Sequence, residues 1–169
     1  MPKNLEVKAR ISSIERAISV AKSLPARYDG ELHQVDTYFN VTYGRLKLRE
    51  INNHYAELIC YKRIEDTNQR VSDFEIYPSH DSPRLKRILE QSIGLQAIVA
   101  KKRSLFIYNT TRIHIDEVER SGSFLELETP FGLSEDAAKK ATEYLIRKFE
   151  VRENDYVLHS YLDLIVAKN

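Results

Sequence analysis

Apolar and polar side chains alternate along most of this chain, which is the pattern of half-buried β-strands. Eight strand-like stretches cover residues 5–10, 33–41, 45–50, 55–63, 71–77, 98–108, 111–118 and 123–129. Short polar connections of hairpin length precede the fourth, seventh and eighth stretches. The pattern therefore predicts eight strands with antiparallel pairing.

Three further segments have the spacing of amphipathic helices, and each follows a start signal. The signals are Ser12 with Glu15, Ser82 with Pro83, and Ser134 ahead of two acidic residues. The last segment, 160–168, is expected to be a final strand or a short element on the outside, and its periodicity does not decide between them.

The polar face of the strands is almost entirely ionisable. In 45–50, for example, Leu46 and Leu48 alternate with basic residues. A half-buried sheet with its charged face in water explains such alternation in many proteins, but a solvated face would tolerate any polar residue, and here Ser, Thr, Asn and Gln are nearly absent. On this face we count nine cations, Lys8, Arg10, Arg45, Lys47, Arg49, Arg63, Lys101, Arg103 and Arg112, and five acids, Glu6, Glu75, Asp116, Glu126 and Glu128.

These charges suggest how the strands are arranged. If eight antiparallel strands close into a barrel or tunnel with the ionisable face inward, helices can cover the apolar outer face, which gives an α+β fold. Such an interior repels itself when empty, because buried charges without partners are costly. A triphosphate would complete it, since Arg and Lys bind its oxygens and carboxylates can hold a divalent metal ion beside it. The charged lining argues against a carrier of apolar molecules.

Composition narrows the class of protein further. A length of 169 residues favours a single domain, 1–169. With 26 basic and 25 acidic residues, the chain is not expected to bind nucleic acid through overall charge. One cysteine, Cys60, excludes an intrachain disulfide framework and fits a reducing compartment, so a cytoplasmic location is expected. No apolar run reaches the ~18 residues that a membrane span needs, so no membrane partner is expected.

Seven segments in order resemble the CYTH, or triphosphate tunnel, superfamily, and especially its class IV adenylyl cyclase branch. They are LEVKAR, HQVDTYF, GRLKLRE, LICYKR, VAKKRSLF, RIHIDEVERSGSFLELE and SYLDL, and together they cover nearly the whole chain. The resemblance implies an eight-stranded tunnel that binds a substrate triphosphate through inward Lys and Arg. It also implies Mg²⁺ or Mn²⁺ on inward carboxylates.

The resemblance leaves the reaction open among three alternatives. In a cyclase, the ribose 3′ hydroxyl of ATP attacks the α-phosphorus, giving cyclic AMP and pyrophosphate. In a triphosphatase, water attacks the γ-phosphorus of inorganic triphosphate, thiamine triphosphate or a nucleoside triphosphate. A third alternative is a module that binds triphosphate or polyphosphate without turnover. The cyclase is the preferred hypothesis, and a homodimer is left open.

Site residues follow from the resemblance by position. The implied metal ligands are Glu6, Asp116, Glu126 and Glu128. The implied triphosphate contacts are Lys8, Arg45, Lys47, Arg49, Arg63, Lys101, Arg103 and Arg112. Among these residues, Glu6, Lys8 and Arg103 are the expected catalytic ones.

Two further positions, 4 and 114, lie on the same predicted inward face. The family has a Glu two residues before Glu6, where this chain has Asn4. An amide keeps an oxygen ligand but loses the charge that hard cations prefer, so we expect weaker metal binding or slower catalysis, unless Asn4 lies in a frayed strand end. His114 shares the inward face, and either a phosphate contact or a structural hydrogen bond would account for it.

Overall fold

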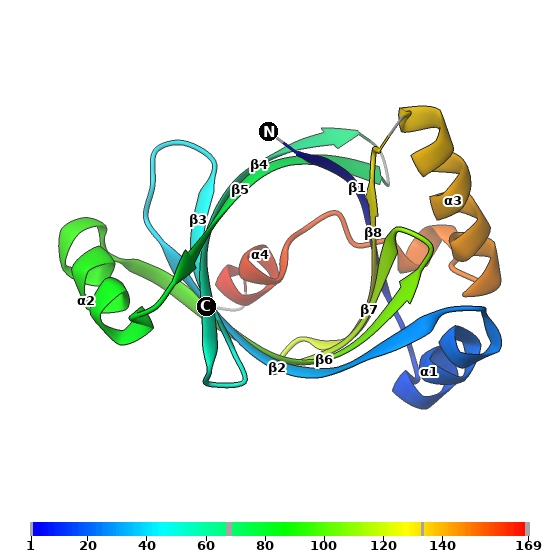
Figure 1. Cartoon of the computed structure of the whole chain (residues 1–169), viewed down its shortest axis with the longest axis horizontal. Coiled ribbons are helices and arrows are strands. Elements are labelled where there is room, and N and C mark those ends of the chain that lie inside the picture. Colours follow the sequence, from blue (N-terminus) through cyan, green and yellow to red (C-terminus); the bar gives the residue numbers. More distant parts are fainter. Residues whose placement is uncertain (1, 67–68, 133, 168–169) are drawn as a thin grey trace.

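The computed structural model describes residues 2–66, 69–132 and 134–167. Eight antiparallel strands close into a barrel in the order β1-β5-β4-β3-β2-β6-β7-β8 (Figure 1). The strands are β1 (Lys3–Arg10), β2 (Arg27–Phe39), β3 (Arg45–Ile51), β4 (Tyr55–Asp66), β5 (Gln69–Ser79), β6 (Leu95–Tyr108), β7 (Thr111–Val118) and β8 (Gly122–Pro130). The predicted α+β fold with an antiparallel barrel is therefore confirmed.

Most observed strands extend beyond the predicted ones, and β2 differs most. It begins at Arg27 rather than at His33, and its pairing with β6 shifts register between Tyr28 and Gly30. Gly30 has a φ of +108°, which side chains with a Cβ rarely adopt. This irregularity interrupts the alternation, so the sequence pattern shows only the regular second half of β2.

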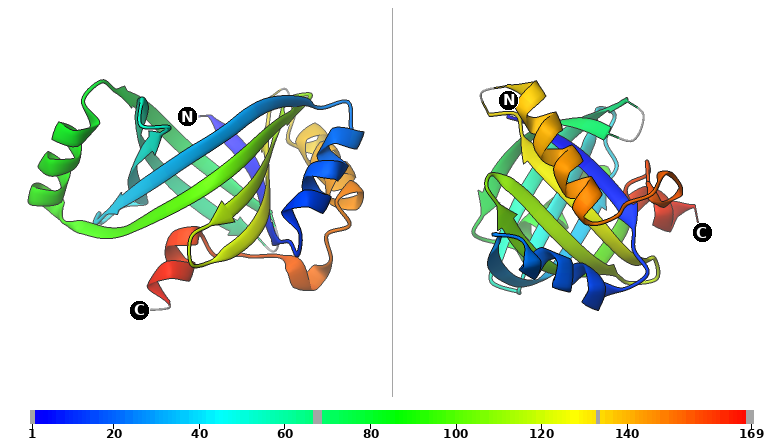
Figure 2. Two further views of the ribbon diagram at one scale, coloured as in Figure 1. Left: turned by 90° about the horizontal axis from the view of Figure 1, so that it is seen from below. Right: turned by 90° about the vertical axis from the view of Figure 1, so that its right-hand side faces the viewer.

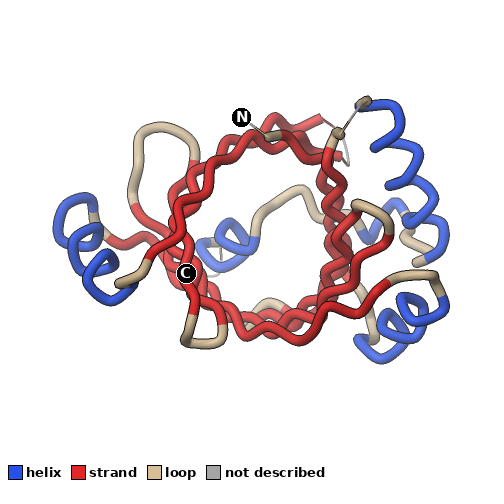
Figure 3. The backbone as a smooth tube through the Cα atoms, viewed as in Figure 1, coloured by secondary structure: helices blue, strands red, loops and turns tan. Residues whose placement is uncertain are grey.

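Helices cover part of the apolar outer face of the barrel (Figures 2 and 3). They are α1 (Ile14–Ser23), α2 (Ser82–Ile93) and α3 (Glu135–Lys148). Ala21 of α1 and Leu145 of α3 belong to one buried cluster with Val7, Ile113 and Leu127 of the barrel strands. Burial of each Val, Leu or Ile side chain in this cluster stabilises the fold by about 1.5–3 kcal/mol. No helix within the described ranges is long and apolar enough to cross a lipid bilayer.

The helix start signals were correct to within one residue. The Ser13 side chain, rather than that of Ser12, caps α1. Asp81 caps α2 and accepts a hydrogen bond from the Arg84 backbone N–H at 3.1 Å. Ser134 caps α3 as predicted. Neighbouring Ser and Asp residues are equivalent as capping candidates in a sequence, so backbone conformation decides which one acts.

The C-terminal segment forms a fourth helix, α4 (Tyr161–Val166), after a single 3₁₀ turn at Glu153–Asp155. Ser160 and Asp163 form a capping box at its start. Figure 1 shows α4 through the ring of strands, and Figure 2 shows it on the side of the barrel opposite the N-terminus. The segment is thus a short helix at one barrel end and not a strand. Lys168 lies outside the described residues.

Candidate functional site

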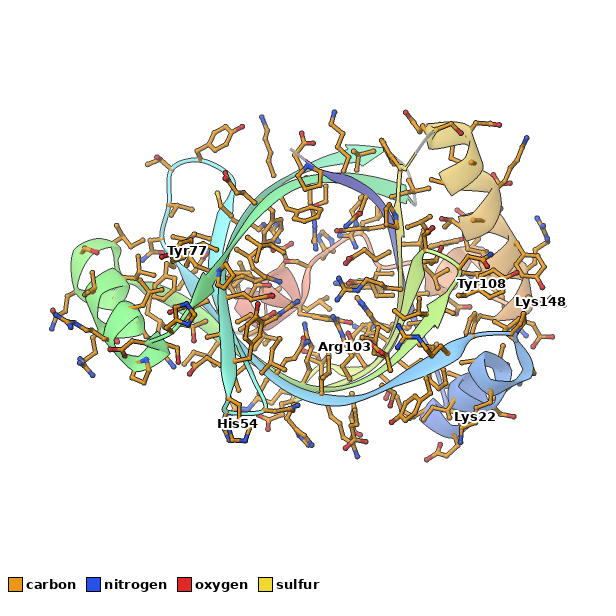
Figure 4. All side chains as sticks on the ribbon, viewed as in Figure 1. Lys22, His54, Tyr77, Arg103, Tyr108 and Lys148 are labelled. Atoms are coloured by element: carbon orange, nitrogen blue, oxygen red, sulfur yellow. The ribbon has the colours of Figure 1, made fainter. Side chains whose placement is uncertain are left out.

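The barrel encloses a cavity of about 690 Å³, a size typical of small-molecule sites. Asn4 near the start of β1 and Pro130 at the end of β8 line it, so the cavity lies toward the barrel end opposite α4. Arg103 points into the ring of strands, whereas His54 and Tyr77 lie outside it (Figure 4). The Lys, Arg and Glu residues of the lining are Lys3, Glu6, Lys47, Arg49, Glu57, Arg63, Arg103, Arg112, Glu126 and Glu128.

Acidic side chains and one histidine gather on β1, β7 and β8. Ligand atoms of His114, Glu126 and Glu128 lie within 4.8 Å of one another. Burial raises the pKa of Glu6, and the nearby charges of Glu126 and Glu128 raise it further, while Arg63 opposes them. The Oε2 atom of Glu6 makes no hydrogen bond with the residues described. Carboxylates that repel one another beside the cavity fit a divalent cation, which would remove the repulsion.

Asp36 is the central anion of the opposite wall. Its carboxylate lies 3.3 Å from Lys47 Nζ, 2.8 Å from Arg49 Nε and 3.3 Å from Lys101 Nζ. Burial alone would raise the pKa of Asp36, but these cations outweigh burial and hold it well below its usual value. Burial lowers the pKa of Lys47 to about 8, and the Arg49 charge lowers it as well. Asp36 therefore fixes three cations, two of which also line the cavity.

Arg103 is fixed in the same way by Asp116. Its Nε and Nη2 atoms each donate to one Asp116 oxygen at 2.7 Å, and the Tyr161 hydroxyl donates to the same carboxylate at 2.8 Å. Burial would raise the pKa of Asp116, but mainly Arg103 lowers it to about 2. Asp116 is fully buried and does not line the cavity. The structure thus places this predicted metal ligand as the partner of Arg103, apart from the acidic cluster.

Lys8 and Lys101 lie between the cavity and α4. Lys8 Nζ is 3.3 Å from Glu126 and 3.7 Å from the centre of the Tyr161 ring, and Lys101 Nζ is 4.9 Å from the same ring. Burial lowers the pKa of each lysine to about 7. Neither residue lines the cavity, so each would act on a ligand there through its charge and not through direct contact.

Arg63 is the lining cation with the most unused hydrogen-bonding capacity. Its Nε is 3.4 Å from a Glu6 oxygen, but neither Nε nor Nη1 makes a hydrogen bond within the described residues. Burial alone would lower the pKa of Arg63, but the nearby Glu6 charge helps to raise it, so the guanidinium stays charged. A guanidinium beside a cavity is suited to bind a phosphate group with the donors that the described residues leave unused.

The structure brings five of the eight predicted triphosphate contacts into the lining: Lys47, Arg49, Arg63, Arg103 and Arg112. Arg45 lies elsewhere, because it donates to Ser160 and Asp163 of the α4 cap and lines a separate cavity of about 180 Å³. Three of the four predicted metal ligands, Glu6, Glu126 and Glu128, line the main cavity.

One inward assignment from strand alternation was wrong. Glu75 is exposed, because its neighbours Phe74 and Ile76 are the β5 residues that line the cavity. Arg10 is exposed at the end of β1 but keeps to the inward face, because its guanidinium lies 4.9 Å from the centre of the Phe124 ring and donates to the Ser121 carbonyl oxygen. Asn4, in contrast, is 7 % exposed and paired with both neighbouring strands, so a frayed end does not explain its departure from the family pattern.

Sequence reasoning missed three charged interior residues, Asp36, Glu57 and Arg70. Asp36 lies in the segment HQVDTYF and is two residues from both Gln34 and Tyr38, so all three share one face of the strand. Strand alternation could therefore have placed Asp36 inside the barrel. Asp36 and Glu57 add two acids to the interior, and Glu75 leaves it. Arg70 adds one cation and Arg45 leaves, so the cationic surplus of the interior is smaller than the sequence suggested. The interior charges are therefore more closely balanced.

Comparison with known proteins decides the family. A profile of the CYTH domain matches residues 2–161. The chain belongs to the CYTH domain family. This CYTH chain is 22% identical over 173 residues to a protein of Methanocaldococcus jannaschii named "Putative adenylate cyclase", and the match covers 95% of the chain and 97% of that protein.

Solved structures share the CYTH barrel. The PH1012 protein of Pyrococcus horikoshii superposes with a TM-score of 0.85 at 22% identity, over 95% of this chain and 98% of its own. A protein of Vibrio parahaemolyticus, titled "putative adenylate cyclase", superposes with a TM-score of 0.80 at 19% identity, over 96% and 97% of the two chains. At these identities the likeness establishes the fold alone.

Proposed function

We propose that this CYTH protein is a divalent-metal-dependent adenylyl cyclase that converts ATP to cyclic AMP and pyrophosphate. The observation that carries the proposal is the cavity itself, in which five Lys and Arg side chains predicted to contact triphosphate lie beside a carboxylate cluster. Cations bind phosphate oxygens, and carboxylates bind the metal that accompanies a triphosphate.

The roles of the cations follow from how each one is held. Arg63 has donors that make no hydrogen bond with the described residues, and it would contact phosphate oxygens directly. Arg103 is held rigidly by Asp116, so it would stabilise developing charge without rearranging. Arg112 is the most exposed of these cations, with 46 % of its side chain accessible, and would meet the ligand near the mouth.

The carboxylates would hold the metal ion. Glu126 and Glu128, with Glu6 nearby, offer the hard oxygen ligands that Mg²⁺ and Mn²⁺ prefer. A bound ion would polarise the phosphate and lower the pKa of the attacking hydroxyl. The Lys and Arg residues of the lining would hold the triphosphate so that pyrophosphate is the leaving group. Cations are most needed there, because negative charge develops on the leaving group.

Another part of the lining favours an organic triphosphate over inorganic triphosphate. Its apolar members are Leu32, Ile51, Ile59, Phe74, Ile76 and Phe131, joined by the ring of Tyr61. A nucleoside could pack on this surface, while inorganic triphosphate would leave it unfilled. The cyclase names of the relatives also favour ATP over a substrate without a ribose hydroxyl.

The decisive test identifies products. Purified protein would be incubated with ATP, inorganic triphosphate or thiamine triphosphate, each with Mg²⁺ or Mn²⁺. We expect cyclic AMP and pyrophosphate from ATP. Phosphate release without a cyclic product would replace the cyclase with a triphosphatase, and binding without turnover would replace it with a binding module.

A matched pair of variants ties the activity to the cavity. Glu128→Gln removes a carboxylate of the lining, whereas Glu75→Gln removes one from the outer face of β5. We expect the first variant to lose most activity and the second to match the unmodified protein. Equal activity of both variants would show that the reaction takes place outside this cavity.

A further inference from the structure

His114 occupies an unusual place for a structural histidine. It lies on β7 directly opposite Glu126 of β8 and is 1 % exposed. Its Nδ1 is 3.4 Å from Glu126 Oε1, and its Nε2 has no hydrogen-bond partner among the described residues. A buried ring nitrogen without a partner is costly, so the side chain is incompletely accounted for by the protein alone.

The surroundings of His114 are those of a metal-binding site. One of its ring nitrogens lies with one carboxylate oxygen of Glu126 and one of Glu128, all within 4.8 Å of one another. Two ligands that each bind one ion at about 2.1 Å are separated by up to about 4.2 Å. A small closure of the side chains would therefore bring all three atoms onto a single ion.

Cations around this cluster offset part of its negative charge, so the type of ligand matters more than charge for which divalent ion binds. Lys8 lies 3.3 Å from Glu126, and Arg112 lies 3.5 Å from Glu128. Asn4 lines the same cavity but contributes no charge. Imidazole nitrogen binds divalent transition metals better than it binds Mg²⁺, which prefers oxygen ligands.

We propose that His114 is a direct ligand of the divalent ion, together with Glu126 and Glu128, and that it makes the site select Mn²⁺ over Mg²⁺. This inference deepens the proposed function, because the selected ion would be the one that accompanies the triphosphate. His114 would supply part of the affinity for the divalent ion that a carboxylate at position 4, where this chain has Asn4, would otherwise supply.

The direct test uses Mn²⁺ without any triphosphate. Electron spin echo envelope modulation detects a ¹⁴N nucleus bound to Mn²⁺, and we expect this signal in the unmodified protein. His114→Gln should abolish it and weaken Mn²⁺ binding by about tenfold or more. His54→Ala, in the exposed β3–β4 hairpin, should leave both unchanged. Bound Mn²⁺ without nitrogen modulation, or no Mn²⁺ binding, would overturn the proposal.

Two further measurements guard against a merely structural effect. Glu128→Gln should weaken Mn²⁺ binding but retain the nitrogen signal, which keeps the proposal testable if His114→Gln fails to fold. By calorimetry, the unmodified protein should bind Mn²⁺ at least about tenfold more tightly than Mg²⁺, and His114→Gln should narrow that ratio. If folded His114→Gln lost affinity for Mn²⁺ and for Mg²⁺ by the same factor, this result would contradict the proposal that His114 makes the site select Mn²⁺.

These metal experiments separate the two proposals. A nitrogen-coupled Mn²⁺ in a protein that forms no cyclic AMP would support the His114 site and remove the cyclase. Cyclic AMP formation with Mn²⁺ bound by oxygen ligands alone would support the cyclase and remove the His114 site.

Discussion

At the scale of single residues, Asp36 stabilises three buried or partly buried cations. Asp36→Asn would leave these cations without their shared anion, so we expect the free energy of unfolding to fall by about 3–5 kcal/mol in urea denaturation. Glu31→Gln is the control, because Glu31 is on the same strand in a partly exposed pair with Lys102 at 3.2 Å and should cost less than about 1 kcal/mol. Similar losses for both variants would contradict the role of Asp36.

Lys47 should couple triphosphate binding to proton uptake. Burial lowers its pKa to about 8, so near pH 8 it is only partly protonated in the empty cavity. A bound phosphate anion raises the pKa of a neighbouring lysine, which then takes up a proton. Calorimetry of ATP binding at pH 8, in buffers with different ionisation enthalpies, should show net uptake that Lys47→Met reduces. Binding heats independent of the buffer would contradict this coupling.

Some site residues could be predicted from strand alternation and others could not. Lys47 and Glu128 occupy regular strand interiors, where every second residue faces the cavity. Glu75 also alternates, but the β5 residues inside are Phe74 and Ile76, because apolar side chains line part of this cavity. Alternation identifies two faces of a strand, and only the closed barrel shows which face is inside.

At the scale of elements, α4 contributes to the site through Tyr161. Tyr161→Phe keeps the ring beneath Lys8 but removes the 2.8 Å hydrogen bond to Asp116. Since that bond is to a charged, buried carboxylate, we expect a loss of about 1.5–3 kcal/mol in the free energy of unfolding.

Tyr77→Phe is the matched control for this prediction, because Tyr77 is 67 % exposed on the outside of the barrel. Chemical denaturation of both variants measures the difference. If Tyr161→Phe is no less stable than Tyr77→Phe, the hydrogen bond to Asp116 contributes nothing to the fold.

The existence of the strands and of three helices could be predicted, but the nature of the C-terminal segment could not be settled. Its apolar residues fit either a strand or one face of a short helix. The pair Ser160 and Asp163 matches a capping box, and this local signal points to a helix start. Six residues are too few for periodicity to decide, so contacts with the barrel end stabilise the helix.

At the scale of the whole molecule, a net charge of +1 conceals how the charges are distributed. The cavity brings Lys and Arg from several strands onto one surface, and Asp36 and Asp116 hold some of them in place. Barrel closure pairs β1 with both β5 and β8, which lie far apart in sequence. Alternation does not encode such pairing, so closure was inferred from the charges and from family resemblance.

The most direct test of the claim that this cavity binds triphosphate is calorimetry with inorganic triphosphate. Its affinity is measured for the unmodified protein and for the variants Arg63→Met and Lys62→Met. Arg63 and Lys62 are adjacent on β4, but only Arg63 lines the cavity, whereas Lys62 is exposed. Arg63→Met should weaken binding about tenfold or more, because a hydrogen bond to a charged group contributes about 1.5–3 kcal/mol. Lys62→Met should bind like the unmodified protein. Unchanged affinity in Arg63→Met would contradict the assignment of this cavity as the triphosphate site.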